Sequence, residues 1–149
     1  MQRAPGEERI FRVPYGDGEL EFMAQPWFDV DVRPAPGRAY DIVIVGVGKP
    51  DDADLHRASR AAARASEFAR EGAAVILPAQ LDEGEGDGPP NTVDALVIVA
   101  ASESPEIVRV AGWRAAVDVE EALDIAYEHT GRPARASVLL IPRVGATPG

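Results

Sequence analysis

"YDIVIVGVGKPDDADLHRASRAAARASEFAREGAAVILPA", residues 40–79, places a helix-like stretch between two apolar runs. The first run, residues 40–48, is apolar at almost every position and rich in β-branched residues, as is typical of a parallel strand buried on both faces. The middle part predicts a helix with one apolar stripe that recurs every three or four residues: Leu55, Ala58, Ala62, Ala65 and Ala69, with Phe68 alongside. Gly72 is the expected end of this helix, and residues 73–79 form the second predicted strand.

The same alternation continues to the end of the chain. Residues 94–101 and 136–142 are further apolar runs. A short helix is predicted from Ser104-Pro105 to Gly112, and a longer one between Asp118 and Gly131. Strands that alternate with helices predict an α/β fold, an open parallel Rossmann-like sheet flanked by helices.

The N-terminal part has a different pattern. Residues 10–32 predict two or three short strands, and Gly16-Asp17-Gly18 is a strong signal for an antiparallel β-hairpin. The proline-rich stretch at 33–39 then leads into the α/β pattern. We therefore expect N-terminal strands and a linker over residues 1–36 and an α/β domain over 37–149, packed as one compact unit.

Composition excludes several classes of function. The chain has 149 residues, no cysteine and a formal net charge of -10, so disulfides and thiolate metal sites are excluded and nucleic acid and anionic lipid are disfavoured partners. No apolar run has the roughly 18 residues of a membrane span. The first residues lack the apolar core of a signal peptide, so a cytoplasmic location is expected. The acidic stretch 82–91 reads as a mobile loop, and we expect no metal site.

Gly46, Gly48 and Lys49 follow the first buried strand, where ligands bind in open α/β sheets. Glycines let the backbone approach a bound group, and the N–H groups of a first helical turn together with Lys49 favour an anion. The spacing matches neither the dinucleotide fingerprint nor a P-loop. A small carboxylate or phosphate is therefore the predicted ligand.

The helix that follows carries Arg57, Arg60 and Arg64 on one side, with His56 adjacent. Arginine near the positive end of a helix is unfavourable unless a negative group meets it, so Arg57 joins the predicted anion site. The alternative is a solvated basic stripe paired with neighbouring acids. His129 is expected to cap the last helix, and we assign no catalytic residue.

Three stretches then reveal a resemblance. Residues 40–79 resemble the start of the C-terminal domain of the nickel-dependent lactate racemase family. "LVIVAASESPEIVRVAGWRAAVDVEEALDIAYEHTGRPARASVLLIP", residues 96–142, is similar to the second half of that domain, and "VPYGDGELEF", residues 13–22, resembles the hairpin that begins the family's N-terminal domain.

The resemblance implies an isomerase that interconverts 2-hydroxy-acid enantiomers by hydride transfer to a nickel pincer nucleotide. In that family the N-terminal domain supplies the cofactor-bearing lysine, the nickel-binding histidine and the catalytic histidines, and this chain lacks that domain. No cofactor is therefore expected in this chain. The family's tyrosine, glutamine and lysine that contact substrate or cofactor correspond to His56, Arg57 and Arg60, so the resemblance adds His56 and Arg60 to the expected ligand site. Because the tyrosine and glutamine are replaced, it also implies a ligand other than lactate.

Three functions stay open from the sequence. The first is a stand-alone domain that resembles the racemase C-terminal domain and binds a small anion or a partner subunit, without racemase activity by itself. The second is one subunit of a split racemase, with the nickel-cofactor domain on another chain. The third is a structural or interaction module without a ligand. A homodimer is expected in addition, because bare strand edges of the hairpin invite association.

Overall fold

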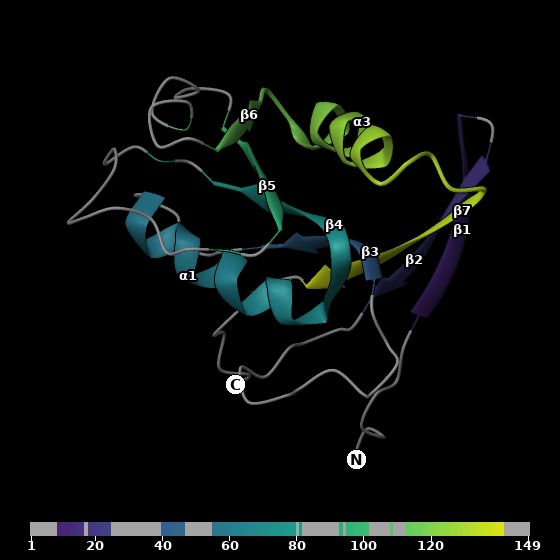
Figure 1. Cartoon of the computed structure of the whole chain (residues 1–149), viewed down its shortest axis with the longest axis horizontal. Helices are drawn as coiled ribbons and strands as arrows, with labels where there is room; N and C mark the ends of the chain where they lie inside the picture. The colour runs from purple at the N-terminus through teal and green to yellow at the C-terminus, as the bar shows by residue number, and fades with distance from the viewer. Residues whose placement is uncertain are drawn as a thin grey trace, which may run out of the picture.

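Seven strands form one sheet in the order β1-β2-β7-β3-β4-β5-β6 (Figure 1). The computed structural model describes residues 9–16, 18–24, 40–46, 55–79, 81, 93, 95–101, 108 and 113–141. The strands are β1 (Arg9–Tyr15), β2 (Gly18–Ala24), β3 (Tyr40–Val45), β4 (Ala69–Pro78), β5 (Leu96–Ala100), β6 (Arg114–Ala116) and β7 (Arg135–Ile141). All neighbouring strands are parallel except β1 and β2, which confirms the predicted α/β fold with its N-terminal hairpin.

The two faces of the sheet carry different helices. Helix α1 (Leu55–Ala65) lies on one face and α3 (Val119–His129) on the other (Figure 1). Alternate residues of β3 belong to two separate cores, so that Val43 and Val45 pack with α1 while Ile42 packs with α3. All three are fully buried, as the continuous apolar run predicts for a strand covered on both faces.

The end of α1 differs from the prediction. The helix stops at Ala65, residues Ser66–Phe68 form a 3-10 helix (η1), and Ala69 already begins β4. Gly72 is therefore not a helix end but lies inside β4 with φ +80°. The pairing with β3 shifts there: Tyr40 faces Ala69, whereas Ile42 faces Ala74. The extra residues of β4 form an irregular turn within the strand. Glycine adopts the positive φ of this turn at little cost.

The boundaries of α3 agree with the predicted capping signals. Asp118 accepts a hydrogen bond from the N–H of Glu121 at 2.8 Å, and the Glu121 carboxylate accepts one from the N–H of Val117 at 3.0 Å. At the other end Gly131 has φ +89°. Since an N-cap aspartate satisfies a backbone donor and glycine adopts positive φ at little cost, both ends are set locally.

The hairpin is part of the main sheet rather than a separate layer. β1 and β2 pair from Arg9 with Ala24 to Tyr15 with Gly18, around a turn in which Gly16 has φ +56°. β2 then pairs with β7 over six residue pairs, which places the hairpin beside the last strand of the chain. Two predictions lie outside the described residues: the boundary between residues 36 and 37 and a third N-terminal strand near 27–32. Of the helix predicted at 104–112, the structure describes only residue 108.

No helix within the described part of the chain is long and apolar enough to cross a bilayer.

Candidate functional site

Gly46 lies directly beyond the carboxyl end of β3. Its N–H donates a hydrogen bond to the carbonyl oxygen of Ile141 at 2.7 Å, so this amide extends the sheet and is not available to a ligand. Gly48 and Lys49 lie outside the described residues. Of the predicted glycine loop, the structure therefore places only its first residue, at the edge of the sheet where ligands bind in this fold.

Helix α1 begins at the same edge of the sheet. Leu55, its first residue, packs in one core with Val45, the last residue of β3. The buried side of the helix is almost entirely small and apolar: Leu55, Ala58, Ser59, Ala61, Ala62 and Ala65. Ser59 is the one polar residue on this side, and its hydroxyl donates to the carbonyl oxygen of His56 at 2.7 Å.

The opposite side of α1 is basic. His56 and Arg57 are half-buried, and Arg60 is exposed. The helix sequence, LHRASRAAARA, contains three arginines and no acidic residue. Arg64 donates to the Glu67 carboxylate at 2.7 Å. Arg64 therefore follows the alternative prediction, in which an arginine of the helix pairs with a neighbouring acid. No ion pair joins Arg60 to any residue within the described ranges.

His129 does not cap α3. Thr130 is the residue after the helix, and its N–H donates to the carbonyl oxygen of Ala126 at 3.0 Å. The N–H groups of Gly131 and Arg132 donate to the carbonyl oxygens of Glu128 and Tyr127 at 3.1 and 3.0 Å. Because these backbone groups satisfy the end of the helix, the exposed His129 side chain stays outside the cap.

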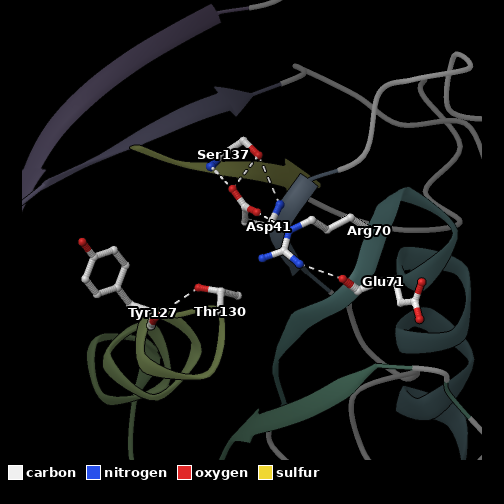
Figure 2. A network of polar contacts seen from close by, with 6 residues as sticks. All are labelled: Asp41, Arg70, Glu71, Tyr127, Thr130 and Ser137. Atoms are coloured by element: carbon white, nitrogen blue, oxygen red, sulfur yellow. Dashed lines mark hydrogen bonds and ion pairs between the residues drawn. The ribbon is translucent and has the colours of Figure 1, made fainter. Parts of the chain in front are cut away.

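A polar network that no sequence motif predicts joins β3, β4 and β7 (Figure 2). The Asp41 carboxylate accepts hydrogen bonds from the N–H of Ser137 at 2.9 Å and from its hydroxyl at 3.2 Å, and it forms an ion pair with Nε of Arg70. A further nitrogen of Arg70 donates to the carbonyl oxygen of Glu71 at 2.7 Å. The only signal in the sequence was an aspartate inside an otherwise apolar strand.

Two cavities flank α3 on the other face of the sheet. One, of about 630 Å³, is lined by residues of the hairpin and of the end of α3: Tyr15, Gly16, Gly18, Asp124, Tyr127, Glu128, Arg132 and Ala134. The other, of about 670 Å³, is lined by Leu96, Arg114, Asp124, Ile125, Glu128 and His129. Neither lining includes the predicted anion-site residues of α1. Within the described residues, no three His, Asp or Glu side chains come together as a metal site would require.

Comparison with known proteins supports the fold alone. No family model matches the chain, and no curated protein matches it in sequence. Among solved structures, the lactate racemase apoprotein from Thermoanaerobacterium thermosaccharolyticum is similar, with a TM-score of 0.58 at 19% sequence identity. The match covers 72% of this chain and 36% of that protein. The chain therefore has a lactate-racemase-like fold and spans little more than a third of the length of the racemase that it resembles.

Proposed function

We propose that this protein is a small binding domain that holds a carboxylate or phosphate at the carboxyl end of β3, through the basic side of α1. One observation carries the proposal. In a chain of net charge -10, α1 carries His56, Arg57 and the exposed Arg60 without an acidic residue in the helix, beside the strand end where α/β sheets bind ligands. Gly48, Lys49, His56, Arg57 and Arg60 are the residues assigned to this site, with Gly46 as its edge.

Arginine suits such a ligand because its planar guanidinium can donate two parallel hydrogen bonds to a carboxylate or phosphate. Arg60 is exposed and so can meet a ligand without leaving a buried position. The name of the structurally similar protein, lactate racemase, adds a hydroxy acid to the ligands to be tested.

Racemisation by this chain alone is not part of the proposal. A nickel pincer nucleotide needs a lysine to carry it and a histidine to bind the metal, and the chain has one lysine and two histidines. In the racemase family, as the resemblance implies, the cofactor-bearing lysine and the metal-binding histidine belong to the N-terminal domain, and neither histidine of this chain lies in a matching motif. We therefore assign no chemical step to the chain.

A second candidate is one subunit of a split racemase. It is favoured by the coverage, since 72% of this chain matches 36% of the similar structure and the larger part of that protein has no counterpart here. In this case α1 would complete a ligand site together with another chain, and the anion-binding role of Arg60 would be retained.

Thermal melting tests the anion site. Lactate, other hydroxy acids, phosphate and mononucleotides are each added to the protein, and a true ligand at about 100 times its Kd adds about 2.7 kcal/mol of stability. For a chain of this size, that gain raises Tm by about 5–10 °C. Arg60→Gln removes the guanidinium and is expected to weaken binding about tenfold or more.

Arg12→Gln is the matched control. Arg12 is also exposed, at 57% of its side chain, but it lies on β1 and pairs with Glu21. It should leave the ligand-induced shift unchanged. If no anion raises Tm, or if Arg60→Gln responds like the unaltered protein, α1 is only a solvated basic surface and the chain is a structural module.

A further inference from the structure

The cavity between the hairpin and the end of α3 lies at the opposite edge of the sheet from the anion site. Gly18 begins β2, and Arg135, the partner of Glu19, begins β7, so the cavity opens at the amino ends of parallel strands. Figure 1 shows the end of β1 beside the segment that leads from α3 to β7. The N–H of Glu19 donates to the carbonyl oxygen of Ala134 at 2.9 Å, which fixes this approach.

Gly18 allows the hairpin to come this close. A Cβ atom on Gly18 would lie 2.5 Å from the carbonyl oxygen of Ala134 and 3.0 Å from the hydroxyl of Tyr127. The hairpin and the α3–β7 loop are therefore in direct contact on one side of the cavity. The cavity is a consequence of how these segments pack and is held open by groups far apart in the sequence.

Two tyrosines form an aromatic wall. The rings of Tyr15 and Tyr127 meet edge to face, with centroids 5.1 Å apart and an interplanar angle of 73°. The Tyr127 hydroxyl donates to the carbonyl oxygen of Pro133 at 2.9 Å, and the Tyr15 hydroxyl donates to the Asp124 carboxylate. Because both hydroxyls already have partners and Tyr127 is buried, the partly exposed ring of Tyr15 is the main aromatic surface offered to a ligand.

Charges of both signs line the rest of the cavity. Asp124 and Glu128 lie one turn apart on α3, and Arg132 follows the helix and forms an ion pair with Glu128. The Glu128 side chain is 59% exposed and the Arg132 side chain is 66% exposed. Water therefore screens this ion pair, and the pair contributes little to stability. A ligand can therefore separate Glu128 from Arg132 at small cost.

The backbone holds Arg132 at this position. Arg132 has φ +52°, an uncommon conformation for a residue with a side chain, and it precedes Pro133, which disfavours helical conformations in the residue before it. Its N–H donates to the carbonyl oxygen of Tyr127 at 3.0 Å, which ties the strained residue to the end of α3. The backbone of Arg132 is therefore fixed at the rim of the cavity, and its side chain lines the cavity.

We propose that this cavity binds a small zwitterion that carries an ammonium and a carboxylate, as a free α-amino acid does. The ammonium meets Asp124 and Glu128, the carboxylate meets Arg132, and an apolar side chain lies on the ring of Tyr15. The ligand replaces one screened ion pair with two charge-assisted contacts of complementary sign. A cation alone would leave Arg132 without its partner, and an anion alone would face both carboxylates.

Titration followed by amide NMR tests this site in the intact chain. L-leucine and L-phenylalanine are added, together with their N-acetyl derivatives, which lack the ammonium, and their amides, which lack the carboxylate. The free amino acids should shift the signals of Gly16, Gly18 and Arg132. Each derivative, and each of the variants Arg132→Gln and Asp124→Asn, should bind about tenfold more weakly or worse, since each loses a charged hydrogen bond.

Arg60→Gln serves as the control, because it removes a charge from the anion site and leaves this cavity intact. Amino-acid-induced shifts of the Gly16 and Gly18 signals that are lost in Arg132→Gln and kept in Arg60→Gln support the cavity independently of the anion site. The proposal is wrong if the free amino acids shift none of these signals at millimolar concentration. It is equally wrong if an amide or an N-acetyl derivative binds as well as the free amino acid, or if the two cavity variants bind normally.

Discussion

Asp41 joins three neighbouring strands through one carboxylate. It lies on β3, and its partners Ser137 and Arg70 lie on β7 and β4, the strands on either side (Figure 2). The Asp41 side chain is only 17% exposed, whereas that of Arg70 is 36% exposed. Because the three donors converge where the β3–β4 register shifts, this residue stabilises the most irregular part of the sheet.

Asp41→Ala is expected to lower the free energy of unfolding by about 2 kcal/mol, since hydrogen bonds to a charged group each contribute roughly 1.5–3 kcal/mol and the donors of Ser137 lose their acceptor. Urea denaturation measures the loss. Glu21→Ala is the control, because Glu21 pairs with an Arg12 side chain that is 57% exposed, and such surface pairs contribute at most about 1 kcal/mol. Equal losses in the two variants would show that the network adds nothing beyond a surface ion pair.

Among the elements, β4 departs most from its sequence pattern. Apolar spacing favoured a helix as far as Ala69, yet Ala69 and Arg70 belong to the strand. Ala69 pairs with Tyr40 of β3, so its backbone is part of the sheet rather than of a last helical turn. Such a choice depends on a partner strand nearly thirty residues earlier, so a local pattern cannot reveal it.

Gly72→Ala tests whether the irregular turn in β4 depends on glycine. An added Cβ meets only the Arg70 guanidinium at 3.4 Å, so space is available, and the cost comes from the φ of +80°. We expect a loss of about 1–2 kcal/mol in the free energy of unfolding. Glu71→Ala, at the exposed neighbouring position, should stay within about 0.5 kcal/mol of the unaltered protein. A Gly72→Ala variant as stable as this control would mean that the turn relaxes to a negative φ.

At the scale of the whole molecule, the helices on the two faces of the sheet differ in charge. α1 carries arginines and a histidine, whereas the α3 sequence, VEEALDIAYEH, carries four acidic residues and one histidine. Of these two helices, α1 therefore offers the more favourable surface to an anion. The hairpin leaves β1 as an edge strand with Pro14, which lacks an N–H, near its end. The expected homodimer stays a prediction, and Pro14 disfavours pairing along that edge.

On the proposed function, the purified chain alone is expected not to interconvert the enantiomers of lactate, because neither of its two histidines lies in a motif like the one that binds nickel in the racemase family. Chiral chromatography of the reaction mixture measures this. For the split-racemase alternative, activity appears only after a second chain with the remaining racemase domain is added, and it falls when that mixture contains Arg60→Gln. A mixture as inactive as its components removes that alternative, and turnover by this chain alone contradicts the proposed function.

The candidate sites differ in how far the sequence could reach them. Gly46, Arg57 and Arg60 are close together in the chain, and the spacing of a strand end and a helix start was enough to group them. The amino-acid cavity combines Tyr15 and Gly18 with Asp124 and Arg132, more than a hundred residues away. No periodicity connects such positions, because their proximity results from β2 pairing with β7.

The sequence by itself determined the elements whose stability is mostly local: the buried strands, the hairpin turn and α3 between Asp118 and Gly131. Apolar periodicity, turn glycines and a capping aspartate act within a few residues, so they can be read in order along the chain. Only the tertiary structure decided where α1 ends, how Gly72 is used and which side chains meet Asp41 and Arg132. The physical reason is that these outcomes depend on strand pairing and burial between distant segments, whose free energy exceeds the small local preference for extending a helix.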